Sequence, residues 1–399
     1  MSPNHARTSR VALTMPRTPD PLWEYEPGAF FFTSPARTLL ARGVHREVPG
    51  PGAAGLPDRV AAALREAEEA GLVHPLVVGA IPFRDDRPAR LLVPAEVRWT
   101  DAPAGSQAVP EPVRGIFTEL GPVPDPGDYM RGVEKALDKL TAGELKKIVL
   151  ARALDVTLGR PVDVRQVLRN LVRRDPQAYG YAVDLPSRTA APRTLLGASP
   201  ELLVSRSGRR IATNPLAGSA PRDPDPAADR ERARALLASD KDLREHALVI
   251  ENVVEALRPY CRELSVPAGP SLLSTASMWH LSTRITGVLD DPAVTSLELA
   301  TVLHPTPAVC GTPAGAARRA IEEIEPFDRG LYAGLVGWCD ATGDGEWVVT
   351  IRCAEVADHR LRLFAGAGIV AGSVPETELA ETTAKFRTML RAVGLDHDR

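Results

Sequence analysis

The sequence predicts an α+β protein built on a mixed β-sheet rather than a doubly wound parallel fold. Between residues 179 and 214, four short β segments follow one another and are punctuated by Gly and Pro: YGYAVDL, RTLLGA, ELLVSRS and RRIATN. Helices with apolar residues at helical spacing lie elsewhere, so strands and helices do not alternate one for one. At 399 residues, the chain is long enough to bury one large core or two ordinary ones.

Composition and charge exclude several classes of protein. The 48 Lys and Arg residues against 51 Asp and Glu give a net charge of −3, so no global basic field attracts nucleic acid or an anionic membrane. The four cysteines are scattered and form no CxxC pair, which argues against a zinc ribbon or a disulfide framework. No apolar run has the length of a signal-peptide core or a membrane span. We expect a cytoplasmic monomer without nucleic-acid or membrane partners.

The N-terminal part of the chain is expected to hold few regular elements. Asp58 caps a helix that ends at Gly71, and an apolar strand follows at 76–83. The prolines between 94 and 126 favour an extended connection and argue against a regular element there. We therefore divide the chain into a flexible tail (1–27) and a single domain (28–398), which comprises an N-terminal subdomain (28–98), a proline-rich connection (99–126) and a core (127–398).

The core supplies most of the candidate functional residues. In chain order we expect a helix at 126–142, a strand at 145–156, the short β segments, a helix at 240–262, a strand at 279–288, a helix at 295–303, a helix at 314–324 and a strand at 331–339.

The C-terminal region places a basic side chain beside open backbone. Alternation over 345–354 predicts a strand in which Arg352 is a lone fixed cation. A turn at 357–358 and an antiparallel return over 360–364 follow. At Ala365–Gly368 we expect a glycine turn, where backbone amides could approach an anion.

Two helices each carry a pair of acidic residues. Asp242 and Glu245 stand three residues apart, as do Glu378 and Glu381, and Lys385 shares the face of the second pair. Acidic clusters beside a phosphate or carboxylate ligand suit Mg²⁺. The alternative is an ordinary solvated helix face opposite the apolar stripe, and periodicity alone favours that alternative.

Three further residues have both a chemical and a structural interpretation. Lys147 lies in an apolar strand, where burial would lower its pKa and make a neutral amine available as a base; alternatively, it reaches solvent from an edge strand. Glu201, between Pro200 and three apolar residues, is either a partly desolvated acid or a strand-edge charge. His280 is either a core histidine or a catalytic group.

Ordered motifs over about residues 30–395 resemble the family of chorismate-utilising enzymes that supplies menaquinone, siderophore and tryptophan pathways. The N-terminal FFFTSPARTLLARG and VVGAIPF are similar to siderophore-pathway isochorismate synthases. The core motifs are KIVLAR (147–152), GASPELL (197–203), NPLAGS (214–219), SDKDLREH (239–246), WHLSTRITG (279–287), HPTPAVCGTP (304–313), EPFDRGLYAGLVGWCD (325–340), GEWVVTIRCA (345–354), AGAGIVAGS (365–373) and ETTAK (381–385).

This resemblance implies a two-sheet sandwich with a large mixed or antiparallel β core surrounded by helices. It also implies a Mg²⁺-dependent interconversion of chorismate and isochorismate, in which water adds at ring C2 and the C4 hydroxyl leaves. By the same analogy Lys147 is the general base and Glu201 the general acid, because water is a poor nucleophile and hydroxide a poor leaving group. The implied Mg²⁺ ligands are Glu245 and Glu381, with Asp242 and Glu378 as additional or water-mediated ones.

The resemblance also assigns residues to the substrate, which carries two carboxylates. It assigns binding of the enolpyruvyl carboxylate to Arg352, Tyr332 and the amides near Gly366 and Gly368. A guanidinium suits this task because it can donate two parallel hydrogen bonds to a carboxylate. Further matches to pocket positions are Gly218, His280, Ala308 and Lys385. The charged face of the last helix should then line a cleft.

Single positions separate the branches of the family. Anthranilate synthases have glutamine where this chain has Lys147, and aminodeoxychorismate synthases have a lysine where it has Ala217. Salicylate synthases share Lys147 and Glu201 but tend to have threonine at the position of Ala308, so salicylate synthase remains the alternative activity. A catalytically silent chorismate-binding protein would be expected to lack one of the acid, base or metal residues, and all are present.

Overall fold

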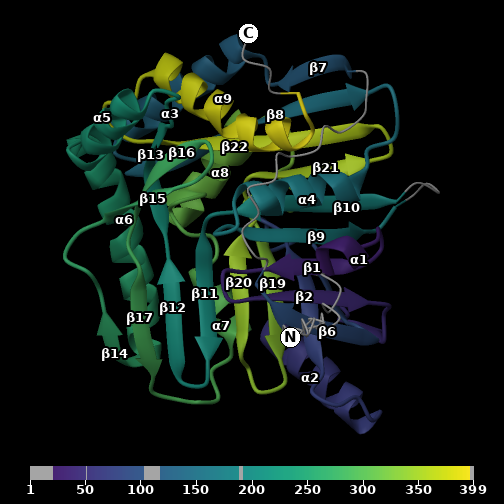
Figure 1. The fold of residues 1–399 in the computed structure, drawn as a ribbon. Helices are drawn as coiled ribbons and strands as arrows, with labels where there is room; N and C mark the ends of the chain where they lie inside the picture. Colours follow the sequence, from purple (N-terminus) through teal and green to yellow (C-terminus); the bar gives the residue numbers. More distant parts are fainter. Residues whose placement is uncertain (1–20, 51, 103–116, 188–191, 396–399) are drawn as a thin grey trace, which may run out of the picture.

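The structure, a computed structural model, describes residues 21–50, 52–102, 117–187 and 192–395. Within these residues, two large antiparallel sheets and one small sheet form the framework, and helices cover its outside (Figure 1). None of the helices in this part of the chain combines the length and hydrophobicity needed to cross a membrane.

The first sheet has ten strands. In spatial order they are β18 (Gly311–Thr312), β8 (Lys147–Leu158), β22 (Arg360–Ile369), β21 (Cys353–Ala357), β10 (Arg193–Ser199), β9 (Tyr179–Leu185), β1 (Phe30–Thr33), β2 (Arg37–Arg42) and β6 (Glu96–Asp101), with β7 (Phe117–Val123) paired to β8 beside this path.

The second sheet has nine strands and the small sheet has three. The second consists of β14 (Cys261–Ser265), β17 (Ile285–Leu289), β12 (Arg210–Asn214), β11 (Leu202–Ser207), β20 (Gly345–Val349), β19 (Leu335–Asp340), β4 (Leu76–Ile81), β5 (Arg90–Val93) and β3 (Arg46–Glu47). The small sheet consists of β13 (Leu216–Pro221), β16 (Met278–Ser282) and β15 (Ser271–Ser274).

Side-chain caps explain where several helices begin. Asp163 accepts a hydrogen bond from the amide of Gln166 at the start of α4 (Val164–Arg174). Ser239 and Thr295 likewise accept from amides in the first turns of α6 (Asp240–Leu257) and α7 (Ser296–Leu303). The helices are α1 (Pro21–Glu24), α2 (Leu56–Glu69), α3 (Pro126–Thr141), α4 (Val164–Arg174), α5 (Pro226–Leu237), α6 (Asp240–Leu257), α7 (Ser296–Leu303), α8 (Ala314–Ile324) and α9 (Pro375–Ala392), with a 3-10 turn η1 (Arg258–Tyr260).

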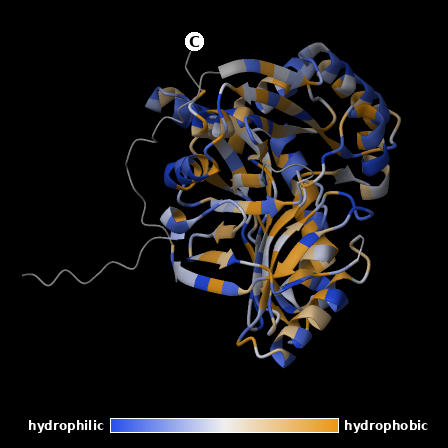
Figure 2. Cartoon of the chain, turned by 90° about the vertical axis from the view of Figure 1, so that its right-hand side faces the viewer, coloured by the Kyte–Doolittle hydropathy of each residue, from blue (hydrophilic) through white to orange (hydrophobic). Residues whose placement is uncertain are grey.

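The two large sheets pack against each other through one hydrophobic core. Phe32 and Leu195 of the first sheet share a cluster of buried side chains with Val78 and Trp347 of the second. The opposite face of the first sheet, which includes Phe31, packs on α1, α4 and α9 in a second cluster. Figure 2 shows the hydrophobic residues concentrated on the strands and the hydrophilic ones on the outlying helices. The predicted two-sheet sandwich surrounded by helices is confirmed; the small third sheet was not predicted.

The chain crosses between sheets at four places that position the site. It leaves the first sheet for the second at Glu201, between β10 and β11, and returns at 350–352, between β20 and β21. It passes from the second sheet to the small sheet at Pro215, between β12 and β13, and comes back at 283–284, between β16 and β17.

Two strand predictions fail at these crossings, and one turn prediction fails within a strand. The strand expected at 279–288 is two strands, β16 and β17, in different sheets, and the strand expected at 345–354 is β20 and β21. Alternation of side chains is a local pattern, so it continues through a crossing without marking it. The glycine turn expected at 365–368 is also wrong, because β22 continues to Ile369 in register with β8.

The N-terminal predictions need correction as well. The expected tail lies outside the described residues up to 20, but Leu22 of α1 and Tyr25 are buried, so ordered structure begins before residue 28. Asp58 lies inside the first turn of α2, whose N-cap is Gly55.

Strands β6 and β7 occupy parts of the proline-rich stretch where no regular element was expected. Among the described residues, β7 pairs with β8 alone, and such an edge strand tolerates Pro122 because one side of its backbone needs no partner. The division of the domain at 99–126 stays a prediction.

Candidate active site

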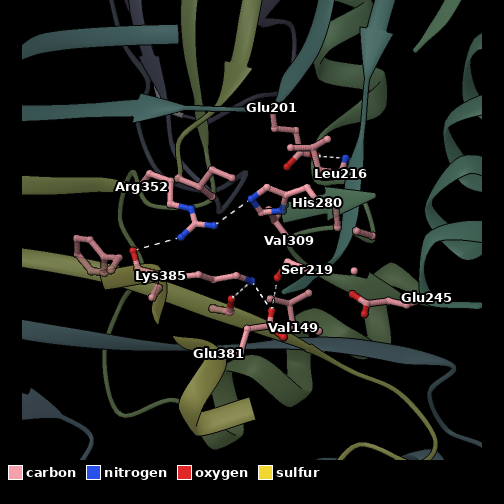
Figure 3. A pocket seen from close by; sticks show the side chains of 18 of the residues that line it. Val149, Glu201, Leu216, Ser219, Glu245, His280, Val309, Arg352, Glu381 and Lys385 are labelled. Atoms are coloured by element: carbon pink, nitrogen blue, oxygen red, sulfur yellow. Dashed lines mark hydrogen bonds and ion pairs between the residues drawn. The ribbon is translucent and has the colours of Figure 1, made fainter. Parts of the chain in front are cut away.

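A pocket of about 620 Å³, counting its open mouth, lies where the chain crosses between the sheets. Figure 3 shows side chains from several elements pointing toward this shared space. Most of the predicted site residues line it: Glu201, Gly218, Glu245, His280, Ala308, Tyr332, Arg352, Gly366, Gly368, Glu381 and Lys385. Lys147, Asp242 and Glu378 are not in the lining but contact or neighbour residues that are.

Glu201 is a buried carboxylic acid at the first crossing. Its side chain is almost fully enclosed, and its Oε1 accepts a hydrogen bond from the amide of Leu216 at 3.4 Å. Burial raises the pKa of Glu201 to about 7, although the Leu216 amide and the charges of Lys147 and Lys385 oppose that shift. The alternative of a solvated strand-edge charge is therefore wrong. Near neutral pH this group can donate a proton into the pocket.

Lys147 is the first residue of β8 and is fully buried, so the alternative of an edge lysine that reaches solvent is wrong. Its Nζ lies 2.9 Å from Oε1 of Glu245 in α6. Gly368 of β22 makes room for this pair, because a Cβ at that position would overlap the Glu245 carboxylate and crowd Cε of Lys147. A cation and an acid are thus held together at the edge of the pocket.

Arg352 is a buried cation at the crossing between β20 and β21. Its φ of 52° lies in the left-handed region, which is unusual for a side chain of this size. The guanidinium donates hydrogen bonds to the backbone oxygen of Lys385 at 3.2 Å and to Nε2 of His280 at 3.3 Å. Burial lowers the pKa of Arg352 to about 10, so it stays charged at neutral pH.

No acidic side chain among the described residues forms an ion pair with Arg352. A buried guanidinium without an anionic neighbour in contact is suited to bind an anionic ligand. His280 beside it is neutral, since burial and the charges of Arg352 and Lys385 hold the pKa of its imidazole well below the usual value. His280 therefore acts as a hydrogen-bond acceptor for Arg352 and not as an acid at neutral pH.

Aromatic residues and glycines shape the other walls of the pocket. Tyr332 stacks on Phe364 with ring centroids 5.0 Å apart, and its hydroxyl occupies the space that a Cβ on Gly366 would need. Gly218 has a φ of 79°, and a Cβ there would press on Asp242. These glycines are required for close approach of side chains as well as for backbone geometry.

The acidic pair of α9 is largely enclosed and lies beside the site. Glu381 accepts hydrogen bonds from Nζ of Lys385 at 2.6 Å and from Oγ of Ser219 at 3.1 Å. Glu378 is completely buried, and Nζ of Lys241 lies 2.7 Å from its Oε1. Burial and the charge of Glu381 raise the pKa of Glu378. The interpretation of this helix face as an ordinary solvated surface is wrong.

The acids fit a hard cation by chemistry, although their present partners are lysines. Among the described residues, no three acidic, His or Cys side chains are grouped closely enough to hold a metal ion. Yet the donor set is made only of carboxylates, and Oε2 of Glu378 is buried without a hydrogen-bond partner in this part of the chain. Burial and the charges of Glu245 and Glu381 also raise the pKa of Asp242.

Three contacts were not predicted from the sequence. They are the amide of Leu216 on Glu201, the hydroxyl of Ser219 on Glu381 and the ammonium of Lys241 on Glu378. All three residues lie inside the motifs NPLAGS and SDKDLREH. Their membership of these motifs was the signal that could have found them.

Comparison with known proteins agrees with the geometry. A family model described as chorismate binding enzyme matches residues 97–394. Isochorismate synthase DhbC of Bacillus subtilis is 55% identical over 382 residues, which cover 94% of this chain and 96% of that protein.

Two solved structures are also similar. The putative 2,3-dihydroxybenzoate-specific isochorismate synthase DhbC from Bacillus anthracis gives a TM-score of 0.90 at 50% identity, over 94% of this chain and 98% of that one. MenF, the menaquinone-specific isochorismate synthase from Escherichia coli, gives 0.78 at 26% identity, over 92% and 89%. The match of the family model to most of the sequence, together with these relatives, shows that the chain belongs to the chorismate binding enzyme family.

Proposed function

We propose that this chain is an isochorismate synthase that interconverts chorismate and isochorismate, uses Mg²⁺, and supplies 2,3-dihydroxybenzoate for siderophore biosynthesis. The observation that carries the proposal is the buried Glu201, whose pKa of about 7 lets it act as an acid at neutral pH. It lines the same pocket as Arg352, which forms no ion pair with an acidic side chain of the described residues. The similarity to DhbC proteins supports the choice of reaction and pathway.

Proton transfer at both ends of the substrate is the task of Glu201 and Lys147. Glu201 protonates the C4 hydroxyl, which leaves as water while the ring double bonds shift. Lys147 accepts a proton from the water that adds at C2, so the product is an isomer of the substrate. For this role, the ion pair between Lys147 and Glu245 has to open and the Lys147 ammonium has to release a proton, because only the neutral amine can accept one from the attacking water.

Binding and orientation fall to the remaining residues of the pocket. Arg352 is proposed to hold the enolpyruvyl carboxylate, assisted by Tyr332 and by the backbone near Gly366. Residues that would hold Mg²⁺ are Glu245 and Glu381, with Asp242 and Glu378 as further or water-mediated ligands. When bound, the cation supplies positive charge that neutralises and orients the ring carboxylate.

The proposal is tested by incubating the purified protein with chorismate and Mg²⁺ and analysing the products. Isochorismate in equilibrium with chorismate, lost on addition of EDTA, is the expected result. Lys147→Gln and Glu201→Gln should each lower turnover by about a hundredfold or more while chorismate still binds. Normal rates in either variant would remove that residue from its role.

Salicylate synthase is the second candidate, because those enzymes share Lys147 and Glu201. Ala308 lies in the pocket lining at a position where salicylate synthases tend to have threonine. This difference favours release of isochorismate over pyruvate elimination. Salicylate and pyruvate as products would establish this alternative.

The proposal also includes a monomeric, cytoplasmic enzyme. Gel filtration tests the oligomeric state, and cell fractionation tests the location.

A further inference from the structure

One lysine beside the acidic residues has no part in the proposed reaction. Lys241 precedes Asp242 in α6, and its Nζ lies 2.7 Å from Oε1 of Glu378 in α9. The Glu378 side chain has no exposed surface, whereas 26% of the Lys241 side chain is exposed. The ammonium therefore reaches a fully buried acid from the solvent side.

Lys241 is the ion-pair partner of a buried acid among the proposed cation ligands. Its Nζ contacts Oε1 of Glu378, and Glu378 stands three residues before Glu381 in the same helix, α9. The ammonium thus supplies part of the positive charge that this group of acids needs in order to be buried.

A divalent cation bound to the same acids would meet this ammonium at short range. Glu378 has a second oxygen, Oε2, which is buried and lacks a hydrogen-bond partner among the described residues. Two positive charges on one carboxylate repel each other strongly where water is largely excluded. A lysine stem is flexible, and the partly exposed Lys241 has a route to water when it leaves Glu378.

We propose that Lys241 is a built-in counter-ion that competes with Mg²⁺ for Glu378 and so weakens cation binding. The inference rests on the cation site of the proposed function. Two other lysines pair with acids in the same way, Lys147 with Glu245 and Lys385 with Glu381, but both have proposed roles in catalysis or substrate binding. Substitution of Lys241 therefore tests the competition without changing a residue that has a proposed role in catalysis or substrate binding.

The opposite role for Lys241 makes the reverse prediction. If the lysine positions Glu378 for the metal, its removal would weaken cation binding. If it competes, replacement by a neutral side chain strengthens binding, and replacement by arginine weakens it, because a guanidinium pairs with a carboxylate through two hydrogen bonds.

The test is a titration of Mn²⁺ into EDTA-stripped protein, followed by the electron paramagnetic resonance signal of free Mn²⁺. Lys241→Gln should bind Mn²⁺ about tenfold more tightly than the unchanged protein, and Lys241→Arg about threefold more weakly. Lys139→Gln is the matched control, because Lys139 has 24% of its side chain exposed and pairs with Glu323 at 3.0 Å in α8. Its Mn²⁺ affinity should not change.

Each titration is repeated in a Glu201→Gln background saturated with chorismate, in case the substrate contributes a ligand. The inference is overturned if Lys241→Gln binds Mn²⁺ no more tightly than the unchanged protein does, both without and with chorismate. If Lys241→Gln does not fold, Lys241→Arg decides, and binding no weaker than that of the unchanged protein overturns the inference.

The proposed function is judged separately, by Mg²⁺-dependent formation of isochorismate by the unchanged protein. If isochorismate forms but Lys241→Gln gains no affinity, only the competition fails. If no variant binds Mn²⁺ and no isochorismate forms, the cation site and the proposed function fail together.

Discussion

Glu201 depends for its acidity on the place where the chain leaves one sheet for another. The crossing removes its carboxyl from water, and among the described residues one amide, that of Leu216, donates to it at 3.4 Å. Too few hydrogen bonds reach this group to offset its burial, so the neutral form is stabilised.

The raised pKa of Glu201 predicts a pH dependence. A general acid must be protonated, and a pKa of about 7 means that the acid form is complete well below pH 7 and is lost as the pH rises through that value. We expect kcat/KM for chorismate to fall as the pH is raised above about 7. Initial rates of isochorismate formation measure this profile.

A matched variant controls for general effects of pH on that profile. Asp155 is an exposed acid paired with Arg362, so Asp155→Asn should leave the profile unchanged. A kcat/KM for chorismate that stays constant between about pH 6 and pH 9 would contradict the role of Glu201 as general acid.

Chemical identity of the site residues could be predicted from the sequence, but their environments could not. The resemblance of the motifs to a known family assigns Lys147, Glu201 and Arg352 to one pocket. Alternation put Arg352 in a regular strand, whereas the structure places it at a crossing with a left-handed φ. Periodicity favoured a solvated Glu378, which is fully buried because α9 packs on the first sheet with one side and on the site with another.

Strand β22 forms a wall of the site because two of its positions lack side chains. Gly366 and Gly368 alternate with alanines, so both glycines point to the same face. Glycines of this kind signal either a turn or a close approach, and the sequence does not distinguish the two. Because β22 pairs with β8 along the whole segment, Gly366 and Gly368 do not form a turn, and they allow close approach of neighbouring side chains.

Gly368→Ala should therefore disable the site without unfolding the protein. The added Cβ would displace the Glu245 carboxylate and disturb its ion pair with Lys147, so we expect turnover to fall by about tenfold or more. Gly269→Ala is the control, because a Cβ there meets no atom within 4 Å. Turnover and circular dichroism of both variants are compared, and full activity in Gly368→Ala would contradict this view of the strand.

A buried ion pair connects elements that are distant in sequence. Arg329 donates to both oxygens of Glu325, to the backbone oxygen of Val149 in β8 and to that of Val309 in the pocket wall. Glu325 in turn accepts from the amide of Ala151. The pair thus holds the strand of Lys147 against the loop after α7, an arrangement that no local sequence pattern reveals.

Loss of this pair should lower the stability of the whole molecule. Arg329→Ala leaves Glu325 buried and uncompensated, which costs about 3–5 kcal/mol of unfolding free energy. Arg362→Ala breaks an exposed pair with Asp155 and should cost about 0–1 kcal/mol. Denaturant unfolding measures the free energy of unfolding of the two variants. Equal losses of unfolding free energy would contradict the stabilising role of the pair between Arg329 and Glu325.

The whole molecule encloses a pocket in which water adds at one ring carbon while the hydroxyl of another, once protonated, leaves as water. The most direct test of this claim is conversion of chorismate in ¹⁸O-labelled water, followed by mass spectrometry of the isochorismate. We expect one labelled oxygen in the product, at the C2 hydroxyl. Isochorismate without label, or no isochorismate at all, would contradict the reaction proposed for Lys147 and Glu201.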